Sequence, residues 1–269
     1  MVLFSLSLFL TACLSLSMGY IQIPVTDIVR LLAAKITGFS DLVQSIDEVH
    51  RAVVYDIRLP RILTCLLTGA ALSLSGVIFQ GILLNPLADP YTLGVSAGAA
   101  FGASIAIVLN LGAALVSVPA FAFTGAAITL AAVILLARTS GAPMAGLSSN
   151  TLILSGIIVA AILSAGISFL KFLANEQVSV IIFWLMGSFA SRTWGHVGLV
   201  AASTVLGFLV SIYYARDLNI ISLGSKSAAS LGVNLKHTFL ALLVTGSLVA
   251  AICVSVSGII GFVGLLVPH

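Results

Sequence analysis

The stretch RLPRILTCLLTGAALSLSGVIFQGILLNPLADPYTLGVSAGAAFG, residues 58–102, decides the fold because it joins two apolar helices through a polar bend. Pro86 and Pro90 lack backbone donors and keep the residues before them out of helical geometry, so the bend is fixed. Asn85 and Asp89 are placed to satisfy backbone groups that the bend exposes. The pattern predicts a rigid helical hairpin, and its functional interpretation is a constriction at the mouth of a pore.

The rest of the chain has the same apolar character. Of its 269 residues, 60% are hydrophobic and 7% are charged, against roughly 25% charged in a soluble domain. Apolar runs of helical length recur without the alternation of a membrane β-barrel. We therefore predict an all-α, polytopic transmembrane helical bundle that forms one domain over residues 1–269. The net charge of +3 does not favour a nucleic-acid partner, and the scattered Cys and His residues predict no metal or cofactor site.

Eight membrane spans are expected, near residues 2–18, 61–80, 91–109, 113–138, 149–172, 196–215, 237–255 and 258 to the end. Residues 25–37 carry an apolar stripe at helical spacing, which predicts a helix on the membrane surface. Residues 178–190 are too short to cross comfortably, so we expect them to enter the membrane and return.

Counting crossings places the connections at residues 85–90, 138–147 and 216–236 on one face, and the Arg58 and Arg61 pair on the other. The first face carries four of the eleven Lys and Arg residues. Taken alone, the positive-inside rule would put that face outside. The family resemblance described below predicts the opposite orientation.

Gly94, Gly98 and Gly102 recur every four residues and predict a helix face that packs closely against a neighbouring helix. The same residues include GVSAG, a match to the G-x-S-x-G nucleophile elbow of serine hydrolases, with Ser96 as the nucleophile. That motif needs a strand before it, and a polar loop stands there instead. An intramembrane hydrolase is therefore the weakest alternative.

Two further segments predict contacts with other proteins. Arg58 and Arg61 flank Pro60 at a helix start, where positive charge is unfavourable, so they either anchor the helix at the membrane interface or bind acidic side chains of a partner. The segment RDLNIISLGSKSAASLGVNLK, residues 216–236, predicts a short amphipathic element suited to gripping another protein. The chain has no P-loop, and its spans hold almost no ionisable groups, which disfavours the alternative of an ion-coupled secondary transporter.

Residues 58–102, together with FWLMG (183–187), the SLG and SLGV of residues 218–233, and GIIGFVGLLVPH (258–269), resemble FecCD-type permeases. These are the membrane subunits of ABC importers for iron-siderophores, haem and cobalamin. The resemblance implies a ten-helix type II importer fold, of which about eight helices are present here, in the cytoplasmic membrane. It implies a second permease subunit, two ATPase subunits, an external binding protein and surrounding lipid. The expected function is import of an iron-siderophore or related metal chelate, with no enzymatic site in this chain.

The resemblance also implies roles for individual residues. Arg58 and Arg61 would face outward and dock the binding protein. The cytoplasmic gate would be formed by Asn85, Pro86, Leu87, Ser149 and Asn150. ATPase coupling falls to Leu223, Gly224, Ser225, Lys226, Ala229, Leu231 and Gly232.

The chain departs from the family pattern in two places. Ser225 and Lys226 stand where the family usually has acidic residues, so the charge pairing with the ATPase is expected to differ. The sequence also stops where the family continues through about two further helices, so the domain is expected to be incomplete at its C-terminus.

Overall fold

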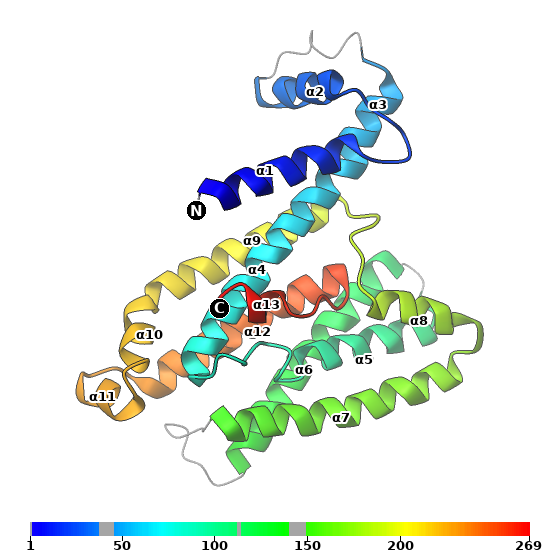
Figure 1. Cartoon of the computed structure of the whole chain (residues 1–269). Helices are drawn as coiled ribbons and strands as arrows, with labels where there is room; N and C mark the ends of the chain where they lie inside the picture. The colour runs from blue at the N-terminus through cyan, green and yellow to red at the C-terminus, as the bar shows by residue number, and fades with distance from the viewer. Residues whose placement is uncertain (1, 38–45, 112–113, 140–148) are drawn as a thin grey trace. The chain divides into compact units, whose positions relative to one another are not determined.

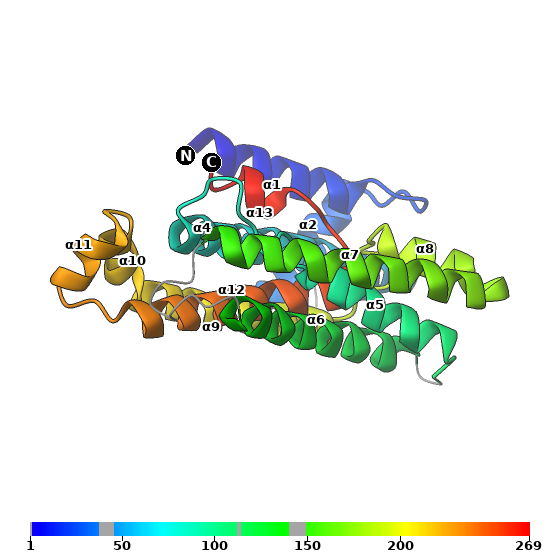
Figure 2. The same ribbon diagram turned by 90° about the horizontal axis from the view of Figure 1, so that it is seen from below.

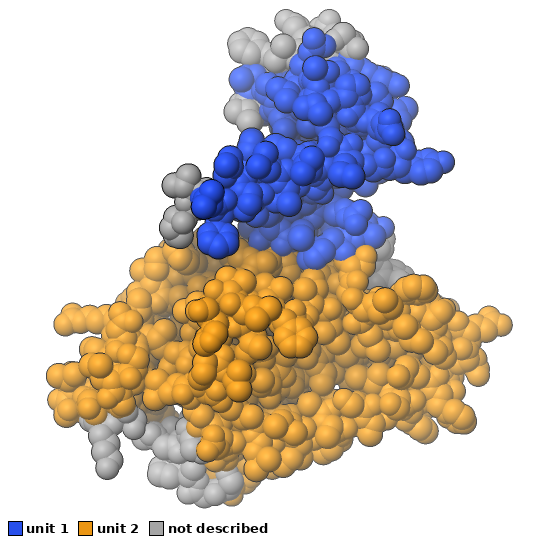
Figure 3. Space-filling model, viewed as in Figure 1, with its two compact units in different colours: residues 1–67, 189–198 blue, residues 68–188, 199–269 orange. Residues whose placement is uncertain are grey.

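A computed structural model describes residues 2–37, 46–111, 114–139 and 149–269, and those residues form helices without strands (Figure 1). The chain divides into two compact units, residues 1–67 with 189–198 and residues 68–188 with 199–269 (Figure 3). The predicted all-α class is confirmed, whereas the single domain over residues 1–269 stays a prediction.

The first unit contains α1 (Val2–Ser17), α2 (Val25–Thr37), α3 (Glu48–Ala52), a π-helical turn (Val53–Arg58) and the start of α4 (Leu59–Leu83). Its core includes Leu16, Ile28, Leu31 and Val54, so α1 and α2 pack against the turn that leads into α4. The surface helix predicted over residues 25–37 is α2, with the same bounds. Its buried face is narrower than predicted, because Val25 and Val29 are exposed.

The second unit begins within α4 and holds the remaining helices. They are α5 (Val95–Val108), α6 (Ala114–Thr139), α7 (Ser149–Leu173), a 3-10 turn (Asn175–Gln177), α8 (Val178–Leu185), most of α9 (Trp194–Tyr213), α10 (Ala215–Ile221), α11 (Ser225–Ser230), α12 (Leu235–Ser257) and α13 (Val263–Leu266). Figures 1 and 2 show α5 beside α6 and α7, and α5 also packs on α12. The glycine-rich helix is therefore at the centre of this unit.

Five of the described helical segments are long and apolar enough to cross a membrane: Glu48–Leu83, Val116–Thr139, Ser149–Leu173, Trp194–Tyr213 and Leu235–Ser257. Each overlaps a predicted span, and the first begins well before the predicted start at residue 61. Two more predicted spans correspond to the shorter apolar helices Leu3–Ser17 and Val95–Val108. The protein is thus a multi-pass membrane protein.

The eighth predicted span does not begin at residue 258, contrary to the prediction. Gly258 ends α12 with φ 74°, Phe262 has φ 67°, and only α13, of four residues, follows. A Cβ on Gly258 would lie 2.4 Å from the carbonyl oxygen of Trp184, so the turn packs tightly against the end of α8. Apolar composition alone had predicted a span where glycine allows the chain to turn.

Candidate functional site

The bend between α4 and α5 is held by hydrogen bonds within itself. The Asn85 side chain accepts a hydrogen bond from Leu87 N at 2.9 Å, and Ala88 N donates to Asn85 O at 3.1 Å. Leu84 adopts a left-handed conformation, with φ 49°, where α4 ends. The prediction that Asn85 satisfies the backbone of the bend is confirmed.

The second half of the bend is organised by Asp89, which is 8% exposed. Its carboxylate accepts a hydrogen bond from Thr92 N at 2.8 Å, and the Thr92 hydroxyl donates to Asp89 O at 2.6 Å. Burial raises the pKa of the Asp89 carboxyl, and hydrogen bonds from the backbone of Thr92 and Tyr91 oppose part of this rise. The predicted contact of Asp89 with the backbone is also confirmed. The bend is therefore ordered by its own polar side chains.

Tertiary contacts fix the position of the bend. The Tyr91 hydroxyl donates to Ile260 O at 2.8 Å, which ties the bend to the segment after α12. Gly94, with φ 78°, starts α5. A Cβ on Gly98 would lie 2.6 Å from Gly125 O, so α5 and α6 meet at backbone distance. The strand required by a nucleophile elbow is absent among the residues described before Ser96.

The start of α7 contacts the end of α4. The Ser149 hydroxyl donates to Leu83 O, two residues before Asn85. Pro86, Leu87 and Asn150 are exposed. The structure thus brings together the two segments that were predicted to form a gate.

The predicted coupling segment forms the two short helices α10 and α11. Leu223 and Leu231 are 69% and 64% exposed, and Ala229 is exposed between them. Gly224 and Gly232 have φ 106° and 84° and bound α11 at its two ends. The backbone of Ser225 and Lys226 opens α11, and their side chains lie outside the described structure. The segment presents apolar side chains on a small ordered element.

Residues that sequence reasoning missed attach this segment to α12. The Thr238 hydroxyl donates to the Asp217 carboxylate at 3.2 Å, and the Tyr214 hydroxyl lies 3.1 Å from His237 Nδ1. The Asn234 side chain caps α12 by accepting from His237 N. The spacing of 21 to 23 residues between these partners gives no periodic signal in the sequence.

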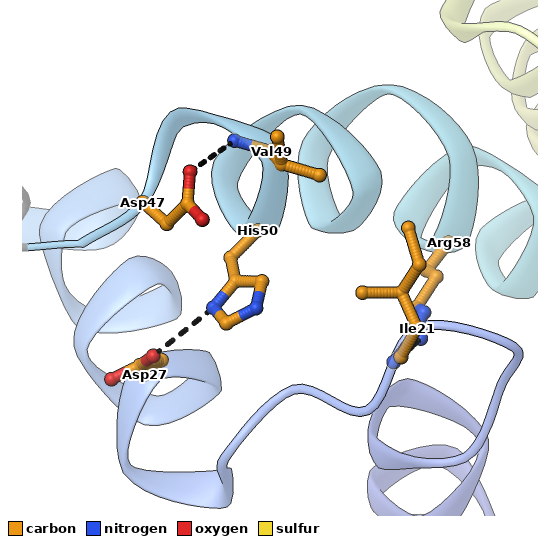
Figure 4. A network of polar contacts seen from close by, with 6 residues as sticks. All are labelled: Ile21, Asp27, Asp47, Val49, His50 and Arg58. Atoms are coloured by element: carbon orange, nitrogen blue, oxygen red, sulfur yellow. Dashed lines mark hydrogen bonds and ion pairs between the residues drawn. The ribbon is translucent and has the colours of Figure 1, made fainter.

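The two predicted docking arginines differ in their surroundings. Arg58 is 8% exposed, and its guanidinium donates to the carbonyl oxygens of Leu16 and Ile21 and, at 3.2 Å, of Ser17. Figure 4 shows the Arg58 side chain beside Ile21. These carbonyls lie at the C-terminal end of α1 and just beyond it, where helical partners are missing. Arg61 is exposed and forms no ion pair within the described part of the chain.

Comparisons with known proteins agree with this architecture. The model of the FecCD transport family matches residues 7–269. The chain is 39% identical to the uncharacterized ABC transporter permease protein YvrB of Bacillus subtilis, over 95% of this chain and 72% of that protein. It is 38% identical to the molybdate import system permease protein MolB of Haemophilus influenzae, over 100% and 77%.

A third relative is the Fe(3+)-citrate import system permease protein YfmE of Bacillus subtilis, 34% identical over 83% of this chain and 66% of that protein. A solved structure, described as an inward-facing conformation of a putative metal-chelate type ABC transporter, matches with a TM-score of 0.78. It is 35% identical, over 97% of this chain and 77% of that one. The chain therefore belongs to the FecCD transport family and is a membrane permease of the ABC-importer class.

Proposed function

We propose that this chain imports a metal chelate of the iron-siderophore class as one of two permease subunits around a central path. Two ATPase subunits supply the energy and an extracytoplasmic binding protein delivers the cargo. The observation that carries the proposal is the contact between the end of α4, just before the bend, and the start of α7 through Leu83 and Ser149. A constriction built from these two ordered segments would suit alternating access. The two compact units act together as one permease domain.

The gate is proposed at Asn85, Pro86, Leu87, Ser149 and Asn150. Because Asn85 and Asp89 satisfy the backbone of the bend internally, the bend is expected to move as a rigid piece with its helices. Movement of α4 against α7 would then open or close the path, without unfolding of the loop between them.

The ATPase surface is proposed at residues 223–232, which include Leu223, Gly224, Ser225, Lys226, Ala229, Leu231 and Gly232. Exposed Leu223 and Leu231 provide apolar anchors for a cleft on the ATPase. Lys226 adds a positive charge, so we expect an acidic or neutral surface on the ATPase opposite α11.

Arg58 and Arg61 are both proposed to serve docking of the binding protein, with a division of labour in which one acts directly and the other indirectly. Arg61 is exposed and has no ion pair with any residue that the structure describes, so its guanidinium can meet a carboxylate. Arg58 supports the docking surface from inside, because its guanidinium is already bonded to the carbonyl oxygens after α1. Both contribute to docking, one directly and one through the surface that it holds.

An iron chelate is favoured as cargo because one relative is named as a permease for Fe(3+)-citrate import, and the similar solved structure is described as a transporter of metal-chelate type. Molybdate, named for another relative, is the competing cargo. On α7, Ser164 and Ser168 are exposed and Ser155 is buried, so only Ser164 and Ser168 are proposed to line the path. Small hydroxyls suit a bulky chelate that the binding protein selects.

The test is uptake by the complex purified through a tag on this chain and reconstituted in proteoliposomes with its binding protein. We expect ATP-dependent accumulation of a labelled ferric siderophore, unaffected by an ionophore. Accumulation of molybdate but not of the ferric siderophore would show that the cargo is molybdate, and the proposed importer function would still hold. Uptake that persists without ATP and collapses with an ionophore would refute the proposal in favour of a secondary transporter.

A further inference from the structure

The side chain of Leu218, on α10, rests directly on Gly81 of α4. A Cβ on Gly81 would lie 2.9 Å from Leu218 Cδ1 and 3.1 Å from both Cδ2 and Cγ. Glycine at this position therefore forms a recess that the leucine fills. Gly81 lies about one helical turn before Asn85, so the recess adjoins the α4–α5 bend.

The other side of α10 is attached to α12. Asp217, next to Leu218 in the chain, accepts a hydrogen bond from Thr238, and Tyr214 lies within hydrogen-bond distance of His237. The helix α10 thus connects the first turn of α12 with the last turns of α4. A displacement of α10 can therefore act on both α12 and α4.

The contact continues into the core beneath the bend. Leu218 packs against a buried cluster that contains Ile82 and Leu83 of α4, Ala88 of the bend and Leu152 of α7. The same place holds the hydrogen bond from Ser149 to Leu83. Because packed interiors have low compressibility, a shift of Leu218 is transmitted to the two segments that meet at the bend.

The helix α11, next along the chain, packs against both α10 and α12, but its described side chains are more exposed than those of α10. A Cβ on Gly224 or on Gly232 would meet no atom within 4 Å, and most of the described side chains of α11 are exposed. Among the described side chains of α11, that of Ala228 is buried. The segment therefore offers exposed side chains to a partner at α11, while α10 carries the contact with α4.

We propose that Leu218 and Gly81 form the joint through which the α10–α11 segment moves the α4–α5 bend. The inference rests on the proposed function, because it requires an ATPase that pushes or pulls on α11. Leu218 is a positioning residue: it touches neither nucleotide nor cargo, and it sets how much movement of α10 reaches the gate.

The test compares Leu218→Ala with Leu240→Ala in the reconstituted complex. Leu240 is a half-buried leucine of α12 that packs against the same cluster, so it controls for loss of apolar volume. We expect Leu218→Ala to keep basal ATP hydrolysis and assembly but to lower the cargo imported per ATP by about tenfold, within the range of coupling between distant sites. Leu240→Ala should leave that ratio unchanged.

A second pair keeps the inference testable if Leu218→Ala does not assemble. Gly81→Ala would collide with Leu218, and Leu218→Val in the same chain would relieve part of the collision. We expect the double variant to import more per ATP than Gly81→Ala alone, which is a non-additive effect.

The proposed joint would be contradicted if the effects of Gly81→Ala and Leu218→Val were additive. It would also be contradicted if Leu218→Ala and Leu240→Ala imported equal amounts of cargo per ATP. In either case the wild-type complex would still import its cargo with ATP. A wild-type complex without ATP-driven import would instead refute the proposed function itself.

Discussion

The two ends of α4 are held by different kinds of interaction. At its start, Arg58 donates hydrogen bonds to backbone carbonyls, and the neighbouring Tyr55 hydroxyl donates to Leu31 O at 2.6 Å. Near its other end, Gly76 and Gly81 allow backbone and leucine atoms to approach closely. The first end depends on charge and hydrogen-bond geometry, whereas the second depends on the absence of side-chain volume.

Because of this difference, the two ends of α4 are expected to tolerate different substitutions. A residue that keeps some donor groups is expected to preserve part of the stability at the start of α4, and a single added methyl group is expected to disrupt its end. Protein interiors resist added volume because no neighbouring atom can move without moving others. The comparison is therefore best tested by substitutions that change only volume or only charge.

The largest effect is expected for Gly76→Ala. Its Cβ would lie 1.8 Å from Gly264 O, a backbone atom that cannot move without shifting α13. Overpacking of this kind costs about 3 kcal/mol or more of folding free energy, even after the gain in helix propensity from alanine. The measurement is the midpoint of thermal unfolding of the protein in detergent.

Gly69→Ala is the matched control for that prediction. It lies on the same helix, and its Cβ would meet nothing within 4 Å. Alanine there should stabilise α4 by up to about 1 kcal/mol, because glycine is a poor helix former. If both variants shift the midpoint in the same direction, close packing does not govern this end of α4.

The next effect concerns Arg58. Replacing it with methionine keeps similar length but removes all donors to the carbonyl oxygens of Leu16, Ser17 and Ile21. Leaving such groups unsatisfied costs about 1 to 3 kcal/mol. Arg58→Lys should fall between wild type and Arg58→Met, because an ammonium lacks the planar fork of donors.

Arg61→Met is the control, with little expected change in the unfolding midpoint because Arg61 is exposed. It should instead weaken binding-protein affinity and reduce its dependence on salt. Arg58→Met is expected to leave the salt dependence close to that of wild type. A loss of salt dependence in Arg58→Met equal to that in Arg61→Met would contradict the division of labour between the two arginines.

Sequence reasoning succeeded where the determining interactions are local. The bounds of α2 follow from a helical apolar stripe, and the roles of Asn85 and Asp89 follow from acceptors placed two or three residues from their donors. Glycine spacing on α5 likewise predicts its packing face. Each of these signals is contained within about four turns of one helix or one bend.

Sequence reasoning failed where a residue's partner is distant along the chain or is of a type that gives no distinctive signal. Arg58 bonds to the backbone of Leu16, 42 residues earlier, and a carbonyl belongs to every residue type. Leu218 meets Gly81, and neither leucine nor glycine is distinctive in a chain with 24 glycines. The predicted last span failed because apolar composition does not show that Gly258 turns the chain.

The smallest effect is expected for Lys35, whose ammonium lies 3.9 Å from the centroid of the Trp194 ring and 4.9 Å from that of Tyr55. The Trp194 indole also donates to Tyr55 O at 3.1 Å. An exposed cation–π contact contributes about 0.5 to 1 kcal/mol, so Lys35→Met should lower the unfolding midpoint slightly and Lys35→Arg should not. Because Lys35→Arg keeps the positive charge and changes the shape of the side chain, a loss in Lys35→Arg equal to or larger than that in Lys35→Met would show that shape rather than charge governs this contact, as it does at the far end of α4, and would remove the contrast between the two ends.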